Sequence, residues 1–204
     1  MLSRAAALVS LLALTAPAAA QDLPPFDCQT FPKDATADSL AETFGAANVV
    51  NTDIDVVEGD VEPGTVLFPD DPDRRVEILW FDSGNHSRPA SVTVKETSAW
   101  TVRGAAGGGI RIGSPLDAVQ RANAKPFSVS GFGWDMGGWV NDWKGGKLDR
   151  LDGGCYLSIR FDPAPDAPDA ALDQASGDRT FASSAAALRA VDPVVSTLSI
   201  GWAE

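Results

Sequence analysis

Alternation of apolar and polar positions predicts most of the strands in this chain. Residues 155–161 show it most clearly, because four apolar side chains share one face while Tyr156, Ser158 and Arg160 share the other. Clusters of Gly, Pro and Asp separate such segments and mark turns. The predicted strands cover residues 50–57, 65–68, 75–81, 91–95, 127–129, 139–143, 155–161 and 194–202.

Two segments combine helical spacing with recognisable ends. A helix over 36–44 begins at Thr36, whose hydroxyl can accept from the first unpaired backbone amides. A second helix takes Ser114 as its N-cap and Pro115 as its first residue, and it ends at Lys125, which precedes a proline. Both helices are short, so they need a sheet to pack against.

Toward the C-terminus, two further segments have contrasting composition. Residues 183–190 are rich in alanine and predict a short helix that ends before Pro193. Residues 162–173 contain almost only Asp, Pro and Ala, which predicts an exposed extended loop rather than core.

The order of elements predicts an α+β fold, in which short helices pack on one face of an antiparallel β meander. Residues 21–103 and 110–204 each begin with a short helix and continue into strands, and the Gly-rich stretch 104–109 reads as a connector between them. The two halves share little residue identity. A tandem structural repeat and a single unrepeated fold therefore both stay open.

The N-terminus predicts export. Residues 1–20 combine a cationic start, an apolar run and small residues ahead of Gln21, which is the pattern of a cleaved signal peptide. That apolar run is short for a bilayer span and no other stretch is suited to one, so we expect no transmembrane segment. No cysteine stands at the cleavage point, so we expect no lipid anchor and a periplasmic or secreted protein.

The two cysteines, Cys28 and Cys155, fit the same compartment. An even number of cysteines in an oxidising environment favours a disulfide, and the alternative is two separate buried thiols. The chain carries a net charge of −12 and lacks a cluster of Lys and Arg, which argues against a nucleic-acid partner. The acidity indicates solubility or, alternatively, a cationic partner.

Catalytic signatures are missing from the sequence. The single histidine, His86, stands in a polar loop and cannot form a multi-histidine metal site. Nucleophile-elbow, Ser-x-x-Lys and phosphate-loop patterns do not occur, and the Asp-rich runs lack the spacing of a calcium-binding loop. We therefore expect no cofactor and no metal, and the sequence favours a non-enzymatic protein.

One constellation is unusual. Three of the six tryptophans fall within ten residues and are interleaved with acidic and amide side chains. Indoles of this kind stack on sugars, anchor a protein partner, or fill a core between a curved sheet and its helices, and all three interpretations stay open. The candidate binding residues are Trp134, Asp135, Trp139, Asp142 and Trp143.

Residues 112–126 (IGSPLDAVQRANAKP) resemble the helix-entry motif of small outer-membrane assembly lipoproteins, although Ala124 stands where that motif has glycine. In tandem, such units are similar to the fold of the secreted β-lactamase inhibitor protein. Residues 127–143 resemble a family of exported bacterial proteins without an assigned activity. The resemblance implies a meander fold and an extracytoplasmic compartment.

Together these features predict an exported, non-enzymatic module that binds a protein or peptide or associates with the cell envelope. The alternative is an exported hydrolase or carbohydrate-binding protein that uses the segment Trp134–Trp143. A concave pocket with two exposed indoles beside Asp135 or Asp142 would favour the alternative, and burial of all three indoles would exclude it.

Overall fold

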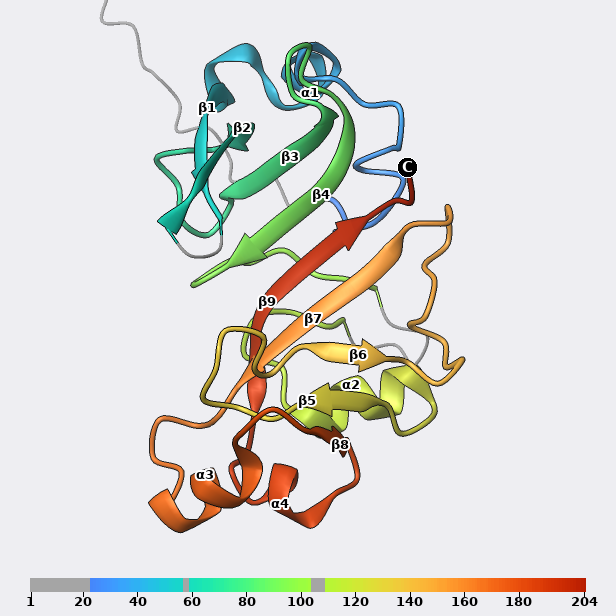
Figure 1. Cartoon of the computed structure of the whole chain (residues 1–204). Helices are drawn as coiled ribbons and strands as arrows, with labels where there is room; N and C mark the ends of the chain where they lie inside the picture. The colour runs from blue at the N-terminus through green and yellow to red at the C-terminus, as the bar shows by residue number, and fades with distance from the viewer. Residues whose placement is uncertain (1–22, 57–58, 104–108) are drawn as a thin grey trace, which may run out of the picture.

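The computed structural model describes residues 23–56, 59–103 and 109–204, and it has the predicted α+β architecture (Figure 1). The predicted signal peptide and all of the connector except Gly109 lie outside the described residues. The helices are α1 (Ala37–Phe44), the 3₁₀ turn η1 (Ala46–Asn48), α2 (Leu116–Asn123), α3 (Asp169–Ala175) and α4 (Ala186–Arg189). The strands are β1 (Val49–Asp55), β2 (Val61–Leu67), β3 (Val76–Asp82), β4 (Ser87–Lys95), β5 (Ser128–Ser130), β6 (Val140–Asp142), β7 (Tyr156–Asp162), β8 (Thr180–Ala182) and β9 (Val194–Gly201).

The main sheet has six antiparallel strands in the order β1-β2-β3-β4-β9-β7. Its first four strands form a meander of sequence neighbours. The last strand, β9, then pairs with β4 on one side, where Val92 faces Ile200, and with β7 on the other, where Leu157 faces the same Ile200. Strands from before and after the predicted connector therefore belong to one sheet.

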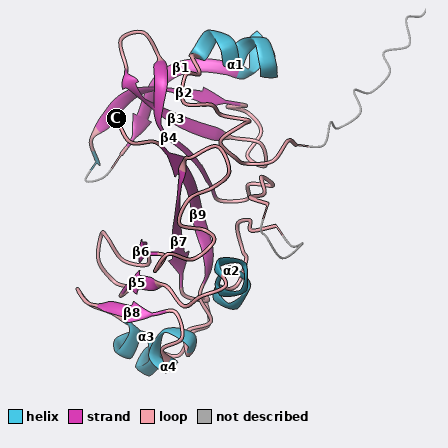
Figure 2. Ribbon diagram, turned by 90° about the vertical axis from the view of Figure 1, so that its right-hand side faces the viewer, coloured by secondary structure: helices cyan, strands magenta, loops and turns pink. Residues whose placement is uncertain are grey.

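A second, three-stranded sheet has the order β6-β5-β8. It lies with α2, α3 and α4 at one end of β7 and β9, whereas α1 lies at the opposite end of the molecule (Figures 1 and 2). Strand β8 has no counterpart in the sequence prediction, because its sequence, Thr-Phe-Ala, holds a single large apolar residue.

The starts of α1 and α2 depend on which groups pair with their first backbone amides. Thr36 caps α1 as predicted, and it forms a capping box with Ser39. For α2 the prediction is wrong by one residue: the N-cap is Pro115, and the Ser114 hydroxyl accepts from the Arg111 amide instead. The reason is tertiary, because the Leu116 amide donates to the carbonyl of Pro193 and so finds its partner at the entry to β9.

The sequence predicts an extended loop over residues 162–173, and this prediction is wrong for the second half of the segment. Pro168 is the N-cap of α3, which begins at Asp169. The helix forms because Ala171 and Leu172 pack against the core, which the acidic composition of the segment does not reveal.

The hydrophobic core lies on one face of the main sheet, as the alternation within each strand requires. In β7, Leu157, Ile159 and Phe161 are buried while Tyr156 and Ser158 are exposed. The same alternation holds in β3 and β4, where Val76, Ile78, Val92 and Val94 are buried while Glu77, Leu79 and Thr93 are partly exposed. Figures 1 and 2 show that the described helices leave the second face of the sheet uncovered.

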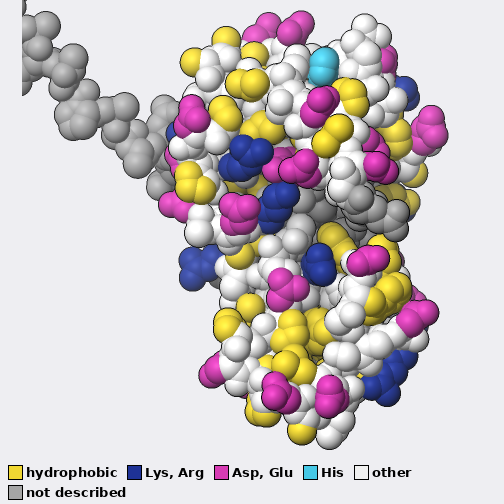
Figure 3. All heavy atoms as spheres, turned by 60° about the vertical axis from the view of Figure 1, so that its left-hand side comes forward, with side chains coloured by type: hydrophobic (Ala, Val, Ile, Leu, Met, Phe, Trp, Pro, Cys, Tyr) yellow, Lys and Arg dark blue, Asp and Glu magenta, His cyan; other side chains and the backbone are white. Residues whose placement is uncertain are grey.

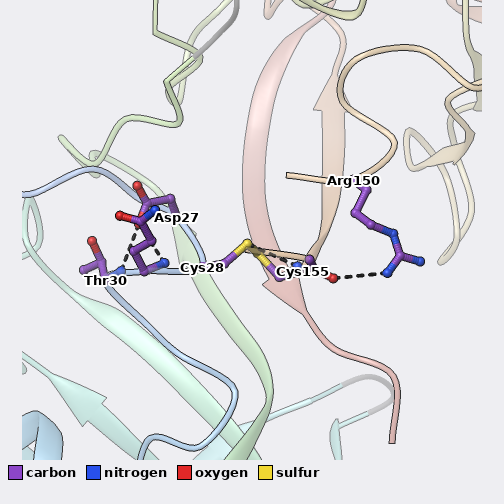
Figure 4. Close-up of a disulfide and its surroundings, with 7 residues drawn as sticks. Asp27, Cys28, Thr30, Arg150 and Cys155 are labelled. Carbon is purple, nitrogen blue, oxygen red and sulfur yellow. Dashed lines mark hydrogen bonds between the residues drawn. A yellow bond between two sulfur atoms is a disulfide. The ribbon is translucent and has the colours of Figure 1, made fainter. Parts of the chain in front are cut away.

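The predicted disulfide is confirmed. Cys28 and Cys155 are bonded with their Cα atoms 5.7 Å apart, and the bond joins the N-terminal segment to the residue before β7 (Figure 4). Gly153 makes this approach feasible, because a Cβ there would lie 2.7 Å from the Cβ of Cys28. Within the described part of the chain, no helix has the length and apolar character that crossing a membrane requires.

Candidate functional site

The uncovered face of the main sheet is hollowed into a trough with a volume of about 840 Å³. Figure 3, in which the left-hand side of Figure 1 comes forward, shows a hollow between the upper and lower parts of the molecule. All six strands of the sheet contribute side chains, and the β5–β6 loop borders the trough. The lining residues are Ile54, Asp55, Val56, Glu62, Glu77, Leu79, Ser91, Thr93, Lys95, Trp134, Asp135, Trp139, Ser158, Arg160, Thr197 and Ser199.

Small hydroxylated side chains form the floor of the trough. Strand register aligns three of them in one row, because Thr93 of β4 faces Ser199 of β9, which in turn faces Ser158 of β7. The Thr93 hydroxyl donates to the Ser199 hydroxyl over 3.0 Å. Ser91 and Thr197 line neighbouring rows. Such a floor offers hydrogen-bond donors and acceptors and leaves room above them.

One wall of the trough carries two indoles. Trp134 is 36% exposed, and its Nε1 donates to the carbonyl of Gly131 over 2.8 Å. Trp139 is half-buried, and its backbone forms an isolated antiparallel β-bridge with Arg160 of β7. The fixed indole of Trp134 therefore presents an apolar surface at little cost in side-chain entropy.

The loop that holds these indoles is anchored to β7. The carbonyl of Gly138 accepts from the Phe161 amide over 2.9 Å, and the carbonyl of Gly137 accepts from Arg160 Nε over 3.1 Å. Gly138 has φ +78°, and a Cβ at this position would lie 2.0 Å from the carbonyl oxygen of Phe161. Only glycine fits this close approach.

Charged side chains of both signs line the trough. Glu77 is bound by Lys95 at 2.9 Å and by Arg75 at 3.1 Å, so its charge is compensated. Asp55, Glu62 and Asp135 form no ion pair within the residues that the structure describes. The exposed part of the lining is therefore acidic, in keeping with the net charge of the chain.

Two of the five predicted binding residues lie elsewhere. Trp143 is only 6% exposed, its Nε1 donates to the carbonyl of Leu157 over 2.9 Å, and its ring packs against Phe127. It belongs to the core. Asp142 is exposed on β6, where hydrogen bonds from the side chain and backbone of Lys144 lower its pKa. The structure thus brings Trp134, Asp135 and Trp139 together and leaves the other two outside the trough.

The titratable side chains that line the trough are carboxylates, a lysine and an arginine. His86 stands in the turn between β3 and β4 and does not line it. Among the described residues, no group of three or more His, Cys, Asp or Glu side chains is placed to hold a metal ion. The arrangement of indoles, hydroxyls and carboxylates is suited to binding through stacking, hydrogen bonds and charge.

Comparison with known proteins adds no relative: no family model, no curated protein and no solved structure matches this chain. The resemblance to assembly lipoproteins and to the β-lactamase inhibitor fold therefore stays a prediction.

Proposed function

We propose that this protein is an exported, non-enzymatic binding module that holds a segment of another protein in the trough. The observation that carries the proposal is the trough itself: a concave face lined by all six strands of the main sheet and bordered by a rigid loop with an exposed indole. The disulfide supports the extracytoplasmic location, because such bonds persist in oxidising compartments.

The chemistry of the trough matches that of protein interfaces. Those interfaces combine aromatic anchors with hydrogen-bonding groups and a polar rim. Here Trp134 supplies the anchor, the hydroxyl row of Thr93, Ser199 and Ser158 supplies the hydrogen bonds, and Asp55 and Asp135 belong to the exposed acidic lining.

A photo-crosslinking experiment tests this function. We would replace Ser158, which points into the trough, with a benzophenone amino acid, and use the exposed Ser184 as the matched control. In envelope and medium fractions of the source organism, the Ser158 variant should crosslink a defined protein that the Ser184 variant does not. The same crosslink should disappear when Trp134 is changed to Ala. Equal labelling by both variants, or labelling that ignores Trp134, would refute the proposal.

Carbohydrate binding is a second candidate, and a specific observation favours it. Trp134 and Trp139 both line the trough beside Asp135, and an indole next to a carboxylate can stack on a sugar ring while accepting from its hydroxyls. A glycan array probed with the full chain distinguishes the two candidates. Selective retention of an oligosaccharide that is lost in Trp134→Ala would favour this second function over the first.

A further inference from the structure

A second hollow, distinct from the trough, lies at the other end of the same sheet face. Its volume is about 400 Å³, within the range of sites for small molecules. Phe81 of β3, Arg88 of β4, Tyr156 of β7 and Trp202, which follows β9, line it. Phe81 and Tyr156 project on the trough side of the sheet, since they alternate with buried neighbours in their strands.

Three cationic side chains, Lys33, Arg88 and Arg150, line this second hollow. Their gathering is notable in a chain with a net charge of −12. Two carboxylates, those of Asp34 and Glu204, also line it. Within the described residues, however, none of the three cations forms an ion pair. Their charge is therefore available to a ligand.

The guanidinium groups are held against aromatic rings. The Cζ atom of Arg150 lies 4.3 Å from the centre of the Tyr156 ring, and Nη1 donates to the carbonyl of Gly154 over 3.4 Å (Figure 4). Arg88 lies 5.9 Å from the Phe81 ring. Contacts of this kind orient a guanidinium. In Arg150, Nη1 and Nη2 already donate to the Gly154 carbonyl and the Tyr156 hydroxyl, and the remaining in-plane N–H groups are left for an anion.

The framework around the hollow is pre-organised. The disulfide fixes Cys155, which stands between two lining residues, Gly154 and Tyr156. Arg88 has φ +57°, a conformation uncommon for a residue with a side chain, and its amide donates to the carbonyl of Ala35 over 2.9 Å.

We propose that this hollow binds a small aromatic anion, that is, a planar ring that carries a carboxylate or phosphate group. The ring would contact Phe81, Tyr156 and Trp202, and the anionic group would accept from Arg88, Arg150 and Lys33. The site is separate from the trough and stands whether or not the trough binds a protein.

Nuclear magnetic resonance titration of the full chain tests the proposal with four probes: phenyl phosphate, benzoate, the neutral benzyl alcohol and inorganic phosphate. We expect phenyl phosphate, benzoate or both to shift the resonance of the Trp202 indole in a saturable way. The resonance of the Trp134 indole should stay unchanged. The better aromatic anion should bind at least about tenfold more tightly than either benzyl alcohol or inorganic phosphate, because only the combined probe uses rings and cations together. Comparison of the two aromatic anions identifies the anionic group.

Matched variants locate the site. Arg88→Gln and Arg150→Gln should each lower the affinity for the better-binding aromatic anion by about tenfold. Lys147→Gln removes an exposed cation elsewhere and should leave this affinity unchanged. Glu204→Gln should strengthen binding, because it removes a like charge from the lining. The proposal is overturned if both aromatic anions fail to saturate, if benzyl alcohol or inorganic phosphate binds as well as the better of them, or if Lys147→Gln weakens binding as much as Arg88→Gln.

Discussion

Identical residue types have opposite roles in the segment that follows β5. Trp134 and Trp143 are both flanked by an acidic residue, yet the first is exposed at the trough and the second is buried against Phe127. The sequence marks the cluster as unusual but cannot separate these roles, because the depth of a side chain depends on which element packs over it. The trough floor was missed for a similar reason: Ser and Thr in alternating strands are typical of any solvated face.

The difference in depth predicts a difference in stability. Trp143→Ala should lower the free energy of unfolding by about 3–5 kcal/mol, because it removes a buried ring and leaves the Leu157 carbonyl without its donor. Trp134→Ala should change it by less than about 1 kcal/mol. Denaturant unfolding of both variants checks this, and equal losses would contradict the assignment of Trp143 to the core.

Asp82 provides a prediction about pH. Hydrogen bonds from the side chain and backbone of Asn85 lower its pKa, with a further contribution from Ser87. Because the pKa is lowered in the folded state, the ionised carboxylate of Asp82 stabilises the β3–β4 turn at pH values above the ordinary pKa of an Asp side chain. This contribution is lost as the pH falls through the lowered pKa. Asn85→Ala should raise the pKa of Asp82, as followed by carboxyl resonances. Asp142, whose pKa is lowered by hydrogen bonds from Lys144 instead, is the control.

At the scale of elements, the sequence predicts strands better than it predicts helix ends. Strand β7 follows directly from alternation, and α1 follows from its capping residues. In contrast, α3 forms in a segment whose composition is typical of a loop, and the start of α2 is set by its contact with Pro193. These failures share a cause, because a short helix owes its stability to the surface on which it packs.

The β5–β6 loop yields a prediction at this scale. Gly138→Ala should displace the loop from β7, because the added Cβ would meet the carbonyl of Phe161 in a backbone conformation with φ +78°. We expect a loss of stability of about 1–3 kcal/mol and faster hydrogen exchange at the Phe161 amide. Gly113→Ala is the control, since it shares a positive φ but has open space around its Cβ position. A comparable effect in both variants would show that strain alone, and not the close approach, is responsible.

At the scale of the whole molecule, two long-range links hold the fold together. Strand β9 joins β4 to β7, and the disulfide closes a loop with a sequence separation of 127 residues. Both connect the part of the chain before residue 104 to the part after it. Whether the two parts descend from a tandem repeat stays a prediction, but they share one sheet and, through it, one trough.

Removal of the disulfide tests the energetic weight of this link. The double variant Cys28→Ser with Cys155→Ser should lose up to about 5 kcal/mol of unfolding free energy, because the crosslink restricts the unfolded chain over a long loop. Thermal and denaturant unfolding of the oxidised protein and of this variant give the measurement. An unchanged midpoint would show that the bond contributes nothing to stability. The second hollow should also lose affinity for its anion, since Cys155 stands between two of its lining residues.

The sequence by itself determined the α+β class, most strands and the capped start of α1, and it favoured a disulfide between the two cysteines, because each depends on spacing within a few residues or on composition. The tertiary structure alone decided that β9 lies between β4 and β7, that Trp134 and Trp139 border the trough while Trp143 fills the core, and that three cations meet around three aromatic rings. Those features bring together residues far apart in the chain, and local pattern carries no information about which distant strand will become a neighbour.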